Sequence, residues 1–241
     1  MITFSHVTKR RGARTILDDV TFTASPGRVT GFVGPNGAGK SSSLRILLGL
    51  DRATGGAAVI GGRRYVDLKR PLTRVGACLG GAGAHPARRA VDHLRWVAAS
   101  NAIPRRRVRE VLDEAGLAEH AKRRAGTFSL GMAQRLGVAT ALLGEPEVLV
   151  LDEPINGLDP EGIRWMRTLV RDHAAAGGTV LISSHVMSEL AEVAHDVVVI
   201  GGGTIRAAGS MSEVTQGFAS LEDAFFTLTA ADAGVAAGGA R

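Results

Sequence analysis

The chain has little cysteine, few aromatic residues and no long hydrophobic run. Its one cysteine, Cys78, excludes an internal disulfide and a metal site built from several cysteines, and we expect it to be a small buried hydrophobic residue. Aromatic residues make up 4% of the 241 residues, which leaves few rings for stacking on single-stranded nucleic acid. No stretch approaches the roughly 20 uninterrupted apolar residues of a membrane-spanning helix. These absences favour a globular protein without membrane spans of its own.

Lysine is also scarce, so most of the positive charge comes from arginine. Lys and Arg number 29 against 23 Asp and Glu, which gives a formal net charge of +6. This balance is compatible with binding to nucleic acid or an anionic membrane surface, but clusters such as the arginines at 105–107 are more often solvated helix faces. The first residues, MITFSHVTKR, do not join a basic start to an apolar core, so we expect no signal peptide and a cytosolic location.

Short apolar runs alternate with helical stretches, which predicts a mixed α/β domain with parallel strands. Strands are expected at 2–7, 20–24, 29–33, 57–60, 75–78, 148–152, 180–183 and 196–200. Between about 90 and 143 no strand pattern occurs, and helices are expected at 91–100, 104–115 and 129–143. A helical subdomain is therefore predicted within a sheet domain. The small residues from 230 to 241 predict a flexible C-terminal tail.

The sequence GPNGAGKS matches the phosphate-loop pattern G-x-x-x-x-G-K-[ST] and lies between an apolar strand and a helix. Its glycines allow successive backbone amides to point at a phosphate chain. Lys40 is expected to neutralise the β- and γ-phosphates, and the Ser41 hydroxyl to ligate Mg²⁺. The residues predicted to bind the nucleotide here are Gly34, Pro35, Asn36, Gly37, Ala38, Gly39, Lys40, Ser41 and Ser42.

Two carboxylates follow a strand of four apolar residues in EVLVLDEP. The carboxyl end of a buried strand is where ligands bind in open α/β sheets, so Asp152 is suited to Mg²⁺ and Glu153 to accepting a proton from the attacking water. The alternative is an ordinary strand end with two solvated acids. His185 directly follows another apolar strand, VLISS, and we interpret it as a sensor of the γ-phosphate, against the alternative of a helix cap or surface residue.

Ser129 and Gly131 stand at the start of an amphipathic helix in GTFSLGMAQR, with no partner in the neighbouring sequence. One interpretation is an ordinary N-cap, in which the serine hydroxyl satisfies a free amide of the first turn. The other is a binding site for an anion, because free amides and the helix dipole favour phosphate at that end. The segment NGLDP, 156–160, is a turn by composition.

Taken in order, GPNGAGKS, FSLGMAQR, LVLDEP, NGLD and SSH resemble the motifs of the nucleotide-binding domain of an ABC transporter, over about residues 1–229. The leucine in FSLGM, with DEPINGLDPEGIRW and LEDAFFTLT, is similar to the separate ATPase subunits of bacitracin-type and related ABC-2 exporters. The resemblance implies a P-loop NTPase of the ABC ATPase type. Its features would be a mostly parallel sheet core, an antiparallel β region and a helical signature subdomain inserted at about 82–143.

The resemblance also implies a composite site. In this family, the residues matched by Ser129 and Gly131 bind the γ-phosphate of a nucleotide held by the phosphate loop of another subunit, and Asp159 belongs to the nucleotide-binding set. The implied subunit dimerises around two ATP with Mg²⁺, as a homodimer or pseudo-dimer, hydrolyses ATP through Glu153, and drives a separate integral membrane permease. We therefore expect a peripheral location at the cytoplasmic face of the membrane and no nucleic-acid partner.

Two positions depart from the family pattern. Arg11 stands where an aromatic residue usually stacks on adenine; because a guanidinium plane can also stack on a base, weak discrimination between bases is expected. Gly80 stands where the family places Gln or an acid, unless the register is wrong by one residue, so slow basal hydrolysis is expected. The permease is expected to contact residues 81–95, which are otherwise a plain surface loop and helix.

The main alternative is a soluble ABC-type ATPase that acts on the ribosome or on DNA. Ribosomal relatives usually hold two such domains in one chain, and this chain has one. DNA-repair relatives insert long coiled coils, whereas the sequence between Ser41 and Ser129 has no sustained heptads. A small-molecule kinase would share the phosphate loop but would not need FSLGM or the Asp152–Glu153 pair. These observations favour the exporter subunit.

Overall fold

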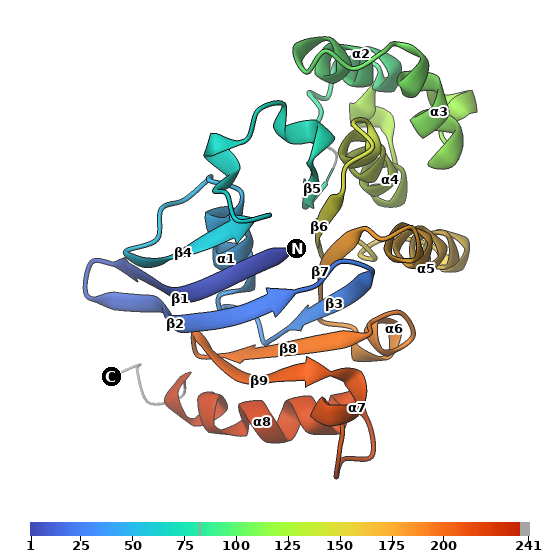
Figure 1. The fold of residues 1–241 in the computed structure, drawn as a ribbon. Coiled ribbons are helices and arrows are strands. Elements are labelled where there is room, and N and C mark those ends of the chain that lie inside the picture. The colour runs from blue at the N-terminus through green and yellow to red at the C-terminus, as the bar shows by residue number, and fades with distance from the viewer. Residues whose placement is uncertain (82, 237–241) are drawn as a thin grey trace.

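A computed structural model describes residues 1–81 and 83–236, with 231–236 described by their backbone alone. The described chain forms two sheets, with strand orders β2-β1-β4 and β5-β6-β7-β3-β8-β9 (Figure 1). The strands are β1 (Ile2–Arg11), β2 (Arg14–Ala24), β3 (Arg28–Val33), β4 (Gly55–Ile60), β5 (Val75–Leu79), β6 (Val148–Asp152), β7 (Thr179–Ser184), β8 (Asp196–Gly201) and β9 (Thr204–Ser210). The helices are α1 (Lys40–Leu47), α2 (Ala90–Ser100), α3 (Arg106–Glu114), α4 (Leu130–Leu142), α5 (Pro160–Ala175), α6 (Met187–Ala191), α7 (Met211–Val214) and α8 (Leu221–Ala236).

The six-stranded sheet is parallel from β5 to β8 and antiparallel only at β9. Its central strands are buried on both faces: every residue of β7 is buried, which is why these strands read as continuous apolar runs. The register places Leu79 opposite Asp152, Asp152 opposite Ser183, and Ser184 opposite Val33. The residues that follow β3, β5, β6 and β7 therefore meet at one edge of the sheet.

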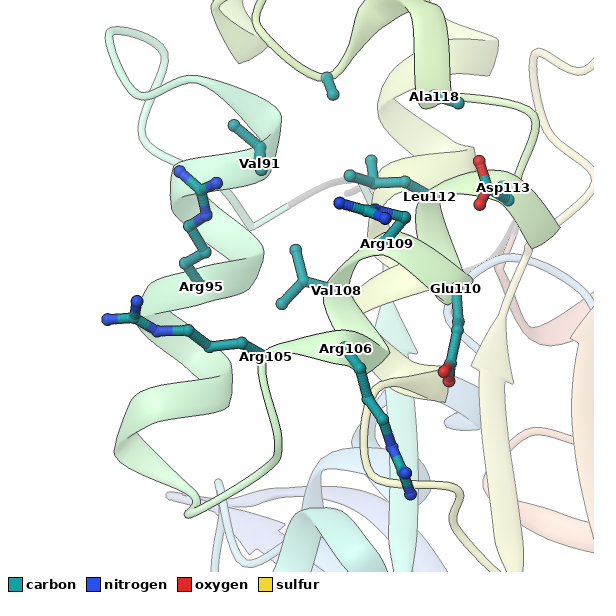
Figure 2. Close-up of a pocket in the computed structure, with 11 residues that line it drawn as sticks. Val91, Arg95, Arg105, Arg106, Val108, Arg109, Glu110, Leu112, Asp113 and Ala118 are labelled. Carbon is teal, nitrogen blue, oxygen red and sulfur yellow. The ribbon is translucent and has the colours of Figure 1, made fainter.

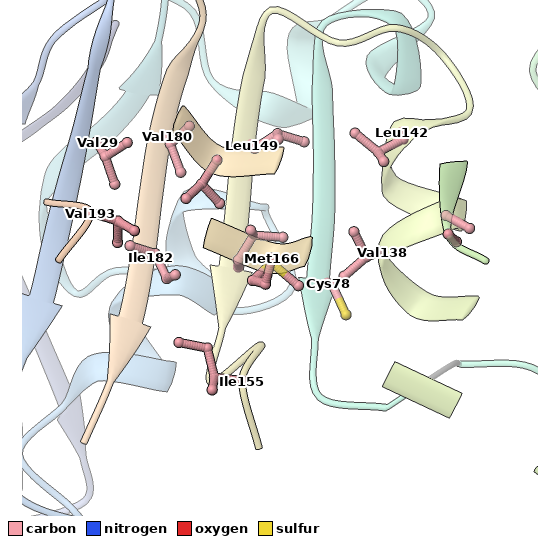
Figure 3. Close-up of a cluster of buried hydrophobic side chains, with 14 of the residues drawn as sticks. Val29, Cys78, Val138, Leu142, Leu149, Ile155, Met166, Val180, Ile182 and Val193 are labelled. Atoms are coloured by element: carbon pink, nitrogen blue, oxygen red, sulfur yellow. The ribbon is translucent and has the colours of Figure 1, made fainter. Parts of the chain in front are cut away.

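Helices α2, α3 and α4 lie between β5 and β6 in the chain and form a group beside the parallel sheet (Figure 1). Their buried apolar residues join the same core as the strands: Val138 and Leu142 of α4 share one cluster with Cys78 of β5 and Leu149 of β6, and Val138 lies beside Cys78 (Figure 3). A second core, under the antiparallel sheet, contains stacked rings of Phe4 and Phe22, 4.4 Å apart between centroids. Cys78 is a free, buried thiol, as predicted.

The predicted α/β fold with a mostly parallel core and an antiparallel region is confirmed, and each predicted strand is present. Strand β9 was missed because its sequence, TIRAAGS, is small, partly exposed and weakly apolar. Helix α3 begins at Arg106, later than the predicted 104, with Arg105 as its N-cap. Helix α8 continues to Ala236, and residues 237–241 of the tail predicted to be flexible lie outside the described residues. In the described part of the chain, no helix has the length and apolar character needed to cross a membrane.

Candidate functional site

The loop between β3 and α1 has a backbone that only glycine fits at two positions. A Cβ on Gly34 would lie 2.4 Å from the carbonyl oxygen of Ile200, and Gly39 adopts a φ of 112° as the N-cap of α1. Gly37 also has a positive φ, of 82°. The loop therefore wraps tightly around the start of α1, where free amides favour an anion. Ser41 and Ser42 lie in the first turn of this helix, and Asn36 is exposed at the loop tip.

Lys40 is buried, with its ammonium group inside the loop. Its Nζ donates to the carbonyl oxygen of Gly34 at 2.5 Å and to that of Pro35 at 3.4 Å. Burial lowers the pKa of Lys40, while the carboxylates of Glu153 and Asp152 act to raise it. In the described residues no carboxylate comes within ion-pair distance of Nζ. A buried cation held only by carbonyl oxygens of its own loop fits a phosphate ligand.

Hydroxyl groups hold both oxygens of Asp152. Ser41 Oγ donates to Oδ2 at 2.9 Å, and Ser183 Oγ donates to Oδ1 at 2.5 Å. The structure therefore brings together the two predicted Mg²⁺ ligands, Ser41 and Asp152, from segments far apart in the chain. Hydroxyl and carboxylate oxygens are the donors that this hard cation prefers, so the residues fit Mg²⁺.

Glu153 and His185 form a close pair. Glu153 Oε2 lies 2.6 Å from Nδ1 of His185, and the backbone amide of His185 donates to the same oxygen at 3.3 Å. The backbone of Glu153 has a φ of 50°, a left-handed conformation that costs free energy in a residue other than glycine. Its amide is held there by the carbonyl and hydroxyl oxygens of Ser183, at 3.2 Å and 3.0 Å.

Ser129 is the N-cap of α4, and its Oγ accepts a hydrogen bond from the amide of Met132 at 3.2 Å. The capping interpretation is thus realised in the single chain. Ser129 also lines an open pocket of about 390 Å³ together with Gly131 and Asp159. A Cβ on Gly131 would lie 2.9 Å from the carbonyl oxygen of Gly157, so the FSLGM segment and the NGLDP turn pack closely. No residue of the phosphate loop lines this pocket.

The two departures from the family pattern have distinct surroundings. Arg11 is exposed and donates to Asp51 Oδ2 at 3.1 Å, and Lys9 Nζ lies 2.5 Å from Oδ1 of the same carboxylate. The ion pairs with Lys9 and, next, Arg11 lower the pKa of Asp51 to about 2. Gly80 follows β5 with a φ of 81° and has open space where a Cβ would stand. A side chain at Gly80 therefore has room but a strained backbone.

The model of the ABC transporter family matches residues 17–156. The chain belongs to the ABC transporter family. This ABC transporter chain is 36% identical over 205 residues to the lantibiotic transport ATP-binding protein SrtF of Streptococcus pyogenes, covering 85% of this chain and 89% of SrtF. It is 38% identical over 208 residues to the bacitracin transport ATP-binding protein BcrA of Bacillus licheniformis, covering 85% of this chain and 68% of BcrA. A solved ATP-binding subunit of an ABC transporter matches with a TM-score of 0.87 and 26% identity, over 95% of this chain and 99% of that one.

These matches confirm the resemblance to exporter-type ATP-binding subunits and identify the ABC chain as an ATP-binding ATPase. Sequence reasoning missed Ser183, which holds both Asp152 and the amide of Glu153. Its signal was present: Ser183 lies near the carboxyl end of an apolar strand, β7, which is parallel to the strand of the two carboxylates. It also missed Asp51, because nothing local connects that residue to Lys9 and Arg11 on β1.

Proposed function

We propose that this ABC ATPase dimerises around two ATP molecules and drives a separate membrane permease that exports drugs, peptides or similar compounds. One observation carries the dimer: the pocket of Ser129, Gly131 and Asp159 shares no lining residue with the phosphate loop of the same chain. A pocket at a helix start, with glycine backbone exposed in it, is complementary to a phosphate that the chain's own loop does not deliver. A second copy, related by a two-fold axis, would present its loop there.

Within one chain, the phosphate loop binds the nucleotide and the carboxylate edge acts on it. Lys40 and the loop amides neutralise the phosphates, and Ser41 with Asp152 holds Mg²⁺. When bound, Mg²⁺ supplies further charge neutralisation at the phosphate oxygens. Glu153 accepts the proton of the attacking water. His185, whose Nδ1 is bonded to Glu153, orients that carboxylate and offers Nε2 to the γ-phosphate.

In the other chain of the dimer, Ser129 and Gly131 contact the same γ-phosphate. Ser129 Oγ already accepts from the amide of Met132, which leaves its proton to donate to a phosphate oxygen. Hydrolysis removes these contacts between chains, so the dimer opens. The cycle of closing and opening is the motion that a permease would follow.

The permease, the peripheral position at the cytoplasmic face of the membrane and the class of exported compound are proposed from the relatives. Their names describe transport of a lantibiotic and of bacitracin. The segment from Gly81 to Arg95 would meet the permease. It follows β5, whose last residue, Leu79, pairs with Asp152 at the carboxylate edge.

The dimer is tested with Glu153→Gln, which keeps the shape of the side chain but cannot accept the proton. With Mg·ATP, this variant should elute as a stable dimer in size-exclusion chromatography with light scattering. Its hydrolysis rate should fall by roughly 10²-fold or more. Glu222→Gln, an exposed change on α8, is the matched control and should behave as the unmodified protein. A Glu153→Gln variant that stays monomeric in saturating Mg·ATP would contradict the proposal.

A further inference from the structure

The connection between β4 and β5 carries an excess of positive charge. Residues 61–74 read GGRRYVDLKRPLTR, with five basic side chains against one acidic side chain. Arg64 pairs with Asp67 at 2.8 Å. Arg74 pairs with Glu147, also at 2.8 Å. In the part of the chain that the structure describes, the other three basic side chains form no hydrogen bond or ion pair, and all are exposed: Arg63, Lys69 and Arg70. We call residues 61–74 the basic connection.

Two exposed apolar side chains lie beside this charge. Val66 of the basic connection is 64% exposed, and Leu50, which follows α1, is 57% exposed. Their segments touch, because a Cβ on Gly49 would lie 2.6 Å from Cγ1 of Val66. Arg52, two residues after Leu50, is exposed and lines one hollow together with Arg64 and Val66. The basic connection and the end of α1 therefore form one surface that is both cationic and apolar.

Burial and pairing within the chain do not explain these side chains. The unpaired cations stand close together in a short segment and repel one another. The exposed valine and leucine leave apolar surface in water. Both arrangements become favourable where a partner supplies negative charge with an apolar layer behind it, which is the composition of an anionic bilayer.

The place of the basic connection in the fold agrees with a membrane partner. In Figure 1 this connection and α2 lie at one end of the molecule, and α8 lies at the other. Residues 81–95, which we expect the permease to contact, run into α2. A subunit that docks on a permease through that segment would therefore turn the basic connection toward the same membrane.

We infer that the basic connection binds the anionic headgroups of the lipid bilayer directly, with Val66 and Leu50 entering the interface. This inference rests on the proposed function, because a membrane permease is what brings such a subunit to a bilayer. Phosphate oxygens of headgroups accept hydrogen bonds from guanidinium and ammonium groups. Nucleic acid offers the same phosphates, but the one ring of the connection, Tyr65, is half-buried and leaves little to stack on bases. The lipid contact holds the subunit at the membrane whether or not the permease is present.

The test uses the full chain and vesicles that contain no permease. Flotation is compared between vesicles of phosphatidylglycerol with phosphatidylcholine and vesicles of phosphatidylcholine alone. The chain should float with the anionic vesicles and not with the neutral ones, and added salt should weaken the binding. Absence of binding to the anionic vesicles, or equal binding to both kinds, overturns the inference.

Charge-removing variants locate the binding. Arg63→Gln with Lys69→Gln should weaken binding to anionic vesicles at least about tenfold, because each basic residue near such a surface contributes roughly fivefold. The matched control is Arg14→Gln with Arg164→Gln, which removes the same charge at exposed positions outside the basic connection. An equal loss in that control shows general charge attraction and overturns the inference. A duplex oligonucleotide that binds through Arg63 and Lys69, with no binding to the anionic vesicles, shows a nucleic-acid surface and also overturns it.

A label at Val66 tests the apolar part of the contact. The native thiol of Cys78 is buried, and burial raises its pKa to about 11, so it should stay unlabelled. An environment-sensitive dye on Val66→Cys should shift its emission to shorter wavelength when anionic vesicles are added. The same dye on Ala219→Cys, exposed before α8, should not shift. Vesicle binding without a shift at position 66 places the contact elsewhere and overturns the inference.

The lipid contact and the proposed function can fail separately. Basal ATPase and the Glu153→Gln dimer are measured on the same preparations as the vesicle binding. Loss of hydrolysis or of the dimer, with vesicle binding intact, removes the proposed function and not the lipid contact. Loss of vesicle binding with the other two intact removes only the lipid contact.

Discussion

The carboxylate edge of the sheet and the basic connection treat charge in opposite ways. At the edge, Lys40, Asp152 and Glu153 are each bonded to groups of the same chain. In the basic connection, the side chains of Arg63, Lys69 and Arg70 have no such partner in the described chain. Preorganised charges hold their geometry before a substrate arrives, whereas unpaired charges await a partner. The comparison teaches which part of the ATPase is complete alone and which is built for association.

The pocket of Ser129, Gly131 and Asp159 is intermediate, since Ser129 caps α4 within its own chain but shares its pocket with no residue of the phosphate loop. This position is tested by mixing two inactive variants, Lys40→Ala and Ser129→Arg, each expected to lose activity about 100-fold or more. In a mixed dimer, one site combines an intact loop with an intact signature. Random pairing should therefore restore about a quarter of the normal ATPase rate. A mixture that stays inactive would show that each chain uses its own signature.

The role of His185 at the carboxylate edge is tested by removing its side chain. His185→Ala removes the hydrogen bond of 2.6 Å to Glu153 and should lower kcat by roughly 10²-fold, because the base loses its orientation. KM for ATP should change little, since the loop binding the phosphates is untouched. The matched control is His6→Ala, which removes an exposed histidine bonded to Asp19. A His185→Ala variant with unchanged kcat would make the histidine an ordinary surface residue.

Gly80 gives a further test of this edge, because it follows β5 there and offers no side chain. Gly80→Gln should raise basal kcat a few-fold relative to Gly80→Ala, which carries the same backbone strain but no amide. Both variants should be less stable by roughly 1 kcal/mol, owing to the φ of 81°. Steady-state ATPase and thermal unfolding separate the two effects. If Gly80→Gln and Gly80→Ala hydrolyse ATP equally fast, the position does not limit hydrolysis.

The smallest effect is expected at Asp51, a paired charge outside the catalytic edge. Its folded-state pKa of about 2 lies below the unfolded value, so its ion pairs stabilise the fold above the unfolded pKa of ~4 and lose this effect as pH falls toward 2. Asp51→Asn should lower Tm by roughly 2–4 °C at pH 7. The difference should shrink in unfolding measured below pH 4. A constant difference across pH would assign the loss to packing instead of charge.

Much of this architecture could be predicted from the sequence, because the buried parallel strands are apolar runs and GPNGAGKS needs no distant residue to define it. The register between strands could not be predicted, so the hydrogen bonds of Ser183 to Asp152 and Glu153 were not foreseen. Strand β9 was not predicted, because it is held by backbone hydrogen bonds to β8 and its own side chains carry little apolar pattern. The surface of the basic connection was not predicted for a similar reason: its basic residues are visible in the sequence, but their lack of partners depends on the fold. The hollow between α2 and α3, lined by residues of both helices, likewise depends on how the two helices pack (Figure 2).

The left-handed backbone of Glu153 has a consequence for how this chain can change. A glycine or asparagine would relax that conformation, and either would remove the carboxylate that we propose takes the proton. Substitutions that raise thermal stability and substitutions that preserve turnover are therefore in conflict at this one position. Substitutions meant to stabilise the subunit therefore have to be made at other positions. The free energy that the strained backbone of Glu153 costs cannot be regained by replacing this residue without losing its carboxylate.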